Sequence, residues 1–111
     1  MNLKLLLPFS LLLSTAITSS VRAAEVGWVY DREVSQIVTV INGGINVRLI
    51  PELTGCVSQS GYGPRFASIY PSHPGKELFQ SNLLAAMISG KKVSLYFSDD
   101  KCTVTEMIIS K

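Results

Sequence analysis

The residues that could do chemistry in this 111-residue chain are few and scattered. His73 is the single histidine, so the chain offers neither a His/Cys cluster nor a histidine pair at helical spacing to bind zinc. No serine lies in a Gly-x-Ser-x-Gly turn, and a Ser-His-Asp triad would depend on His73 alone. Asp99 and Asp100 are adjacent in a polar turn, where we expect solvated carboxylates. We therefore expect no enzyme activity, no catalytic residue, no metal site and no cofactor.

One loop combines the groups that bind sugars. Residues 58–65, with the sequence SQSGYGPR, place hydroxyl and amide groups, one aromatic ring and one guanidinium in a glycine-rich segment. An aromatic ring can cover the C–H patches of a sugar while polar groups bind its hydroxyls. We name Ser60, Tyr62 and Arg65 as candidate ligand-binding residues. The alternative interpretation is an ordinary loop tip close to a disulfide.

Two other aromatic positions have a structural and a functional interpretation. Trp28-Val29-Tyr30 lies early in the chain, where a tryptophan is more often a packing residue than a platform for a ligand. Strand alternation points Tyr96 away from the core, beside Ser94. An outward tyrosine can contact a subunit or a ligand, although a single exposed aromatic residue is ordinary.

The first 23 residues have the layout of a secretory signal peptide. Met1–Lys4 carries a positive charge, residues 5–13 are mostly apolar, and Val21-Arg22-Ala23 places small residues where a signal peptidase cleaves. The apolar stretch is too short to span a membrane. We therefore expect residues 24–111 to form a single exported domain, periplasmic or secreted, without stable membrane insertion.

The expected export also affects the predicted state of the two cysteines and the net charge of the remaining chain. In an oxidising compartment Cys56 and Cys102 are expected to form an intramolecular disulfide; an intermolecular bridge or two free thiols are the alternatives. Lys4 and Arg22 leave with the leader, so eight basic residues remain against eight acidic ones. A neutral domain has no general attraction for phosphate backbones, which argues against nucleic acid as a partner.

Periodicity predicts five strands and one helix. Residues 26–50 form two strands joined by Asn42-Gly43-Gly44, a strong hairpin signal. Ser72-His73-Pro74 introduces a helix over 77–89, which Gly90 ends. Strands at 66–70, 93–97 and 103–109 complete the set. The residues expected in the core are Ile45, Val47, Leu49, Val93, Leu95 and Phe97 on the strands, and Leu78, Phe79, Leu83, Ala86 and Met87 on the helix, widened by Leu84 and Ile88.

The resulting order, β-β-β-α-β-β, predicts a small α+β domain. Five strands with one helix between the third and the fourth is the element order of the OB-fold, a partly open barrel that binds oligosaccharides or oligonucleotides. The alternative is another small antiparallel sheet packed on one helix.

A segment of the chain adds a family resemblance. A helix ending in Ser89-Gly90-Lys91-Lys92-Val93 leads into a tyrosine-bearing strand and a second cysteine, so that residues 83–102 carry the pattern. This resembles the small OB-fold B subunits of bacterial A–B type toxins, in particular the subtilase-cytotoxin and pertussis-like group, and short exported bacterial proteins of unassigned role. The resemblance implies a ring of identical subunits that binds cell-surface glycans without catalysis. The chain is shorter than those subunits and has one possible disulfide, and none of their sugar-contacting residues is carried over.

Two functions therefore stand as expectations. The first is an exported, non-catalytic module that binds a protein partner, with the final strand as an edge on which a partner strand can pair. The alternative is a glycan-binding, toxin-B-like subunit that forms a homo-oligomeric ring.

Overall fold

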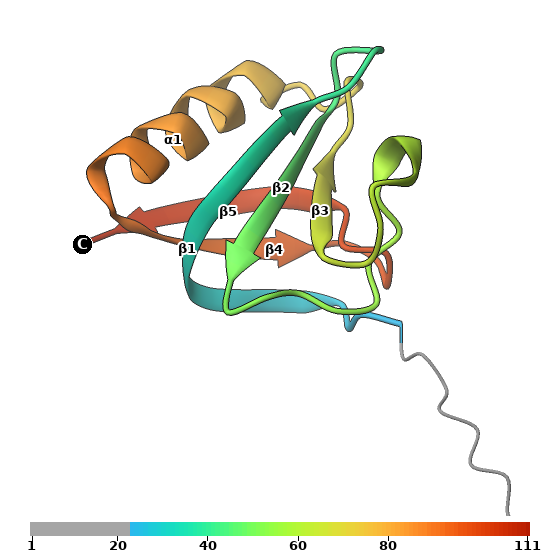
Figure 1. Ribbon diagram of the computed structural model, residues 1–111, viewed down its shortest axis with the longest axis horizontal. Coiled ribbons are helices and arrows are strands. Elements are labelled where there is room, and N and C mark those ends of the chain that lie inside the picture. Colours follow the sequence, from blue (N-terminus) through green and yellow to red (C-terminus); the bar gives the residue numbers. More distant parts are fainter. Residues whose placement is uncertain (1–22) are drawn as a thin grey trace, which may run out of the picture.

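The computed structural model describes residues 23–111, so the expected signal peptide lies outside the described residues except for Ala23. Within that range the chain forms a curved sheet of five strands, with one α-helix covering one end of it (Figure 1). The expectation of a small α+β domain is confirmed. The elements are β1 (Gly27–Thr39), β2 (Ile45–Ile50), the 3-10 turn η1 (Gln59–Gly61), β3 (Phe66–Ile69), α1 (Lys76–Ser89), β4 (Lys92–Phe97) and β5 (Val104–Ser110).

The sheet has the order β3-β2-β1-β4-β5, and all its neighbouring strands are antiparallel. β1 belongs to both halves, because its first part pairs with β4 and its second part pairs with β2. Register shifts between Val29 and Arg32 and between Val34 and Gln36 interrupt these ladders. Bulges increase local twist and bend a strand, and Figure 1 shows β1 curving between the two halves.

The two edge strands approach one another at one end of the sheet. The Ser68 N–H donates to the Cys102 carbonyl at 3.0 Å, and Ser68 forms an isolated parallel bridge with Thr103. No continuous ladder joins β3 to β5 in the described residues, so the sheet is curved but not closed.

The strand alternation predicted from the sequence is confirmed in the core. Ile45, Val47, Leu49, Val93 and Leu95 have no exposed surface. Phe97 is 2% exposed. These side chains come from strands on both sides of β1, and together they build one apolar cluster.

The helix contributes less to this core than its composition predicts. Phe79, Leu83 and Ala86 are buried, which matches three- and four-residue spacing. The prediction was wrong for four other apolar residues, because α1 contacts the sheet through a single face. The exposed ones are Leu78 (72%), Leu84 (47%), Met87 (38%) and Ile88 (76%).

His73 joins the start of the helix to the edge of the sheet. Its Nδ1 accepts a hydrogen bond from the Gly75 N–H at 2.9 Å, so its Nε2 carries the proton and donates to the Thr105 carbonyl at 3.2 Å. The ring also packs edge-on against Phe79, with the centroids 4.7 Å apart. His73 is therefore a half-buried residue with a structural role.

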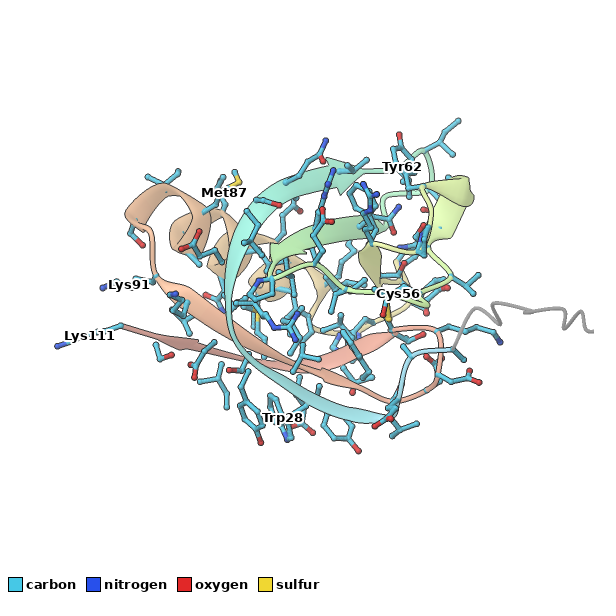
Figure 2. All side chains as sticks on the ribbon, turned by 60° about the horizontal axis from the view of Figure 1, so that its bottom comes forward. Trp28, Cys56, Tyr62, Met87, Lys91 and Lys111 are labelled. Atoms are coloured by element: carbon cyan, nitrogen blue, oxygen red, sulfur yellow. A yellow bond between two sulfur atoms is a disulfide. The ribbon has the colours of Figure 1, made fainter. Side chains whose placement is uncertain are left out.

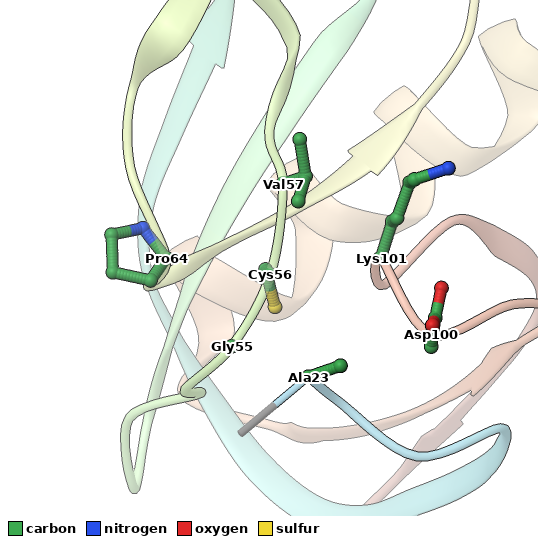
Figure 3. Close-up of a pocket in the computed structure, with 7 residues that line it drawn as sticks. All are labelled: Ala23, Gly55, Cys56, Val57, Pro64, Asp100 and Lys101. Carbon is green, nitrogen blue, oxygen red and sulfur yellow. The ribbon is translucent and has the colours of Figure 1, made fainter. Parts of the chain in front are cut away.

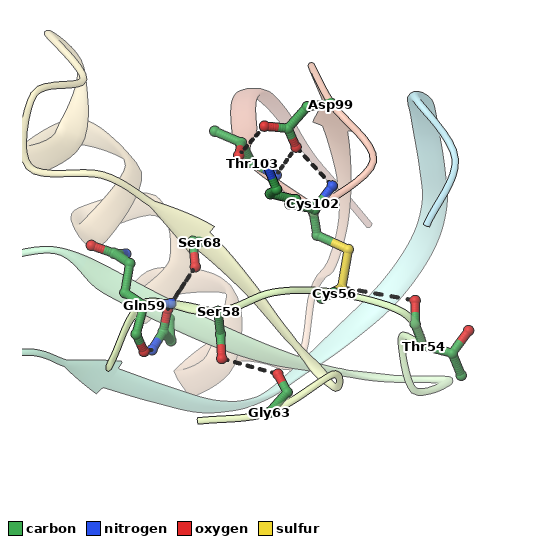
Figure 4. The surroundings of a disulfide bond; sticks show 11 residues. Thr54, Cys56, Ser58, Gln59, Gly63, Ser68, Asp99, Cys102 and Thr103 are labelled. Atoms are coloured by element: carbon green, nitrogen blue, oxygen red, sulfur yellow. Dashed lines mark hydrogen bonds between the residues drawn. A yellow bond between two sulfur atoms is a disulfide. The ribbon is translucent and has the colours of Figure 1, made fainter. Parts of the chain in front are cut away.

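The expected pairing of Cys56 with Cys102 is confirmed, with 5.2 Å between their Cα atoms (Figure 4). Next to Cys102, Asp99 accepts hydrogen bonds from the Lys101 N–H at 2.9 Å, the Thr103 N–H at 3.1 Å and the Thr103 hydroxyl at 2.6 Å. Partial burial raises the pKa of Asp99, but these hydrogen bonds outweigh that effect and hold the pKa below its ordinary value. Asp99 thus orders the turn that presents Cys102.

Removing the disulfide should destabilise the domain strongly. The crosslink spans 46 residues of sequence, and for a loop of that length chain entropy predicts a loss of about 3–4.5 kcal/mol in the free energy of unfolding. We expect urea denaturation to show this loss for the Cys56→Ala/Cys102→Ala double variant, and for the wild-type protein in reductant. Reductant should leave the double variant unchanged. Equal midpoints for oxidised and reduced wild-type protein would contradict the expectation.

Candidate functional site

The predicted ligand-binding residues are all exposed, but they do not form one cluster. Ser60 and Tyr62 line an open hollow with Thr39, Val40 and Ile41 beside the β1–β2 turn. The Tyr62 ring contacts Phe66 edge-on, with 5.8 Å between centroids. Arg65 is not part of that hollow, and its Nε lies 3.5 Å from a carboxylate oxygen of Glu52. The structure therefore brings Ser60 and Tyr62 together and places Arg65 in a surface ion pair.

Just inside this loop, a buried polar network ties the loop to β2 and β3 (Figure 4). The Gln59 carboxamide nitrogen donates to the carbonyls of Ile45 at 3.2 Å and Ile69 at 3.1 Å. The Gln59 N–H donates to the Ser68 hydroxyl at 3.1 Å, and that hydroxyl donates to the Asn46 Oδ1 at 2.8 Å. The Asn46 Nδ2 completes the ring by donating to the Gln59 carbonyl at 2.9 Å.

This network buries a residue that the sequence predicts to be exposed. Alternation along 45–49 points Asn46 toward solvent, yet its side chain is completely buried. The reason is that the segment carrying η1 lies over the outer side of β2 and β3 and supplies the hydrogen bonds that water would otherwise make. The polar residues Asn46, Gln59 and Ser68 thus hold a loop in place on a strand face that would otherwise be exposed.

An aromatic cluster lies on the opposite side of the molecule from α1, on the outer surface of β1 and β4 (Figure 2). Trp28 pairs with Tyr96 across the two strands, and their rings meet edge-on with centroids 5.4 Å apart. The Tyr30 ring stacks on Trp28 at 5.8 Å, with 20° between the ring planes. Tyr30 is 60% exposed, whereas Trp28 and Tyr96 are half-buried.

The bulge in β1 accompanies this arrangement. Asp31 has a φ of 55°, and its N–H donates to the Ser94 hydroxyl at 3.1 Å. The register shift between Val29 and Arg32 takes up the extra residues next to Tyr30. The sequence interpretation of Trp28 as a packing residue and of Tyr96 as an outward residue did not predict that the two rings meet, because they are brought together by the pairing of β1 with β4, two strands far apart in the sequence.

The same surface continues to the edge of the sheet. On β5, Glu106 pairs with Tyr96 and Ile108 pairs with Ser94. Glu106 is exposed, and Ile108 is 47% exposed. We call the surface formed by Trp28, Tyr30, Tyr96, Glu106 and Ile108 the aromatic face. It combines the exposed side chains of Tyr30 and Ile108 and the half-buried rings of Trp28 and Tyr96 with the carboxylate of Glu106 on the last strand of the sheet.

The described residues contain no group of three or more His, Cys, Asp or Glu side chains placed to hold a metal ion. None of the helices between residues 23 and 111 is long and apolar enough to cross a membrane.

None of the protein-family models, curated proteins or solved structures compared with this chain matches it. Its function is therefore inferred from the geometry of residues 23–111 and from the sequence.

The network around Gln59 generates a test by double substitution. A Cβ added to Gly44 would collide with the Gln59 carboxamide, so Gly44→Ala should lower the free energy of unfolding by about 1–3 kcal/mol. In a Gln59→Ala background the collision partner is gone, and we expect most of that cost to disappear. Denaturation of the two single variants and the double variant measures this coupling. Strictly additive effects would show that the Gln59 side chain does not lie over Gly44.

Proposed function

We propose that this protein is an exported, non-catalytic binding module that engages a protein partner through the aromatic face. The observation that carries the proposal is the cluster of Trp28, Tyr30 and Tyr96 on the outer side of the sheet, in which Tyr30 is exposed and the other two rings are half-buried. Aromatic residues are enriched at protein interfaces, and tryptophan and tyrosine are the residues that most often dominate their binding energy.

The form of the surface favours a protein partner over a small ligand. The aromatic face lies on the sheet surface, whereas small-molecule sites are concave and enclose their ligand. It also ends at β5, which has no further strand beside it in the described residues. An extended partner segment can pair with such an edge and place alternate side chains beside Tyr96 and Ile108.

Export is part of this proposal. The Cys56–Cys102 disulfide supports it, because disulfides persist in oxidising compartments and are rare in the cytosol. The leader pattern in residues 1–23 points in the same direction. Together they favour a periplasmic or secreted protein.

We further propose that the domain is an OB-like, partly open barrel. Three observations support this: β1 is shared by both halves of the sheet, α1 lies between β3 and β4 in the chain, and the parallel bridge from Ser68 to Thr103 brings β3 and β5 together. OB-folds bind oligosaccharides and oligonucleotides on the face of their second and third strands and on neighbouring loops.

This connectivity favours a second candidate function, that of a glycan-binding subunit in a homo-oligomeric ring. Here, however, the face of β2 and β3 is filled by Gln59 and its hydrogen bonds. A glycan would therefore bind at the rim of that loop, where Ser60 and Tyr62 line a hollow and Arg65 lies nearby in the chain. The two candidates thus use different surfaces, and one set of variants separates them.

A photo-crosslinking experiment tests the protein partner. With benzoylphenylalanine in place of Tyr96, ultraviolet light should join the exported protein to one discrete protein, because Tyr96 lies in the centre of the aromatic face. The Trp28→Ala substitution should weaken the interaction with that protein at least tenfold, as expected for an interface hot spot. Mass spectrometry identifies the adduct, and titration with the purified partner measures the affinity.

Tyr62 provides the control, since this tyrosine is 48% exposed, and so more accessible than the half-buried Tyr96, but lies outside the aromatic face. Benzoylphenylalanine at Tyr62 should give no such adduct, and Tyr62→Ala should leave partner affinity unchanged. Glycan-array binding that is lost in Tyr62→Ala but kept in Trp28→Ala, together with a ring-sized mass by light scattering, would instead establish the second candidate.

A further inference from the structure

The backbone nitrogen of Ala24 lies between two loops that the disulfide connects. It is 3.1 Å from the Asp100 carbonyl oxygen and 3.3 Å from the Gly55 carbonyl oxygen. Gly55 precedes Cys56, and Asp100 lies two residues before Cys102. Ala24 is partly buried against the core cluster. Figure 3 shows the hollow at this place, with Ala23 facing Gly55 and Cys56 on one side and Asp100 on the other.

The Ala24 nitrogen has two carbonyl acceptors, which is more than a peptide nitrogen can satisfy in full. A peptide N–H has one hydrogen, so the two carbonyl oxygens must share it. An α-ammonium group has three hydrogens and can donate one to each carbonyl in full. It also carries a positive charge, and hydrogen bonds from charged donors are roughly twice as strong as those between neutral groups. The site therefore suits a chain terminus better than it suits a peptide bond.

We infer that the exported protein begins at Ala24 and that its α-ammonium group links the two loops of the disulfide. Hydrolysis of the Ala23–Ala24 peptide bond by a signal peptidase would consume one water molecule. The Ala23 carbonyl becomes a carboxylate that leaves with the leader, and the Ala24 nitrogen becomes the ammonium group. Val21 and Ala23 are the small residues such a peptidase requires. This inference rests on the proposed export of the protein.

The disulfide and the new terminus would act on the same contact. Besides the Cys56–Cys102 bond, the Val57 N–H donates to the Lys101 carbonyl at 3.1 Å, so the two loops are already aligned. In that alignment the carbonyls of Gly55 and Asp100 are both within reach of a single nitrogen. Cleavage of the leader would therefore add a charged contact between two loops that the disulfide already holds together.

The charge of the terminus makes this contact sensitive to pH. The charged side chains around the two hollows that border Ala24 are Asp100 and Lys101 on one side and Glu25, Arg32 and Glu52 on the other. Two carbonyl acceptors favour the charged form, so we expect the pKa of the ammonium group to lie above its unfolded value of about 7.7–8.0. The stability that it contributes is complete below that range and is lost as the pH rises through the folded-state pKa.

The first experiment determines the terminus itself. The full chain is expressed in a bacterium, and the protein recovered outside the cytoplasm is analysed by N-terminal sequencing and intact mass. We expect a single terminus at Ala24. A protein that retains Met1 would overturn the proposed export, whereas an exported protein that begins at Ala23, Glu25 or elsewhere would overturn the present inference and leave export intact.

The second experiment tests the role of the charge. Two oxidised proteins are compared that both begin at Ala24, one with a free terminus and one acetylated on that nitrogen. At pH 6.5 the unfolding equilibrium constant of the free form should be at least fivefold lower, and this difference should diminish by pH 9.5. A third form that begins at Ala23 keeps the charge but moves it by one residue, and should behave like the acetylated form. Parallel pH profiles of the free and acetylated forms would overturn the inference.

Discussion

The shared strand β1 is the constraint on which the rest of the structure depends. Its first part pairs with β4 and its second part with β2, so both halves of the sheet are fixed relative to one chain segment. The bulges in this strand let the sheet curve until Ser68 of β3 reaches Cys102, and that approach brings the disulfide-bearing turn against β3. The same curvature leaves Trp28 and Tyr96 together on the convex, outer side.

Much of the fold could be predicted from the sequence because the relevant signals are local. Alternation in Ile45–Leu49 and in Val93–Phe97 follows directly from the pleat of a strand, and Asn42-Gly43-Gly44 has few conformations other than a turn. The disulfide could be predicted because the chain has two cysteines and its first 23 residues have the pattern of an export leader. Each of these predictions needs only the identities of neighbouring residues or the number of cysteines in the chain.

The remainder depends on contacts between distant residues. Leu84 and Ile88 have helical spacing and apolar side chains, but how much of α1 is buried depends on the size of the sheet surface beneath it. Asn46 alternates like an exposed residue, and only the loop that carries Gln59 buries it. The aromatic face could not be predicted from the sequence for a similar reason. Trp28, Tyr30 and Tyr96 are brought together by a strand pairing and a bulge, and neither is visible in the composition.

The ring of hydrogen bonds around Gln59 has a consequence for how such a sequence can change. Its carboxamide contacts the carbonyls of Ile45 and Ile69, which are directly paired across β2 and β3. A slip of one residue between these strands would present different carbonyls, so the loop fixes their register. Gly44, Asn46, Gln59 and Ser68 are therefore constrained as a set rather than singly. Proteins descended from a common ancestor would have to replace these four together, and the quartet could identify kinship after the rest of the sequence has diverged.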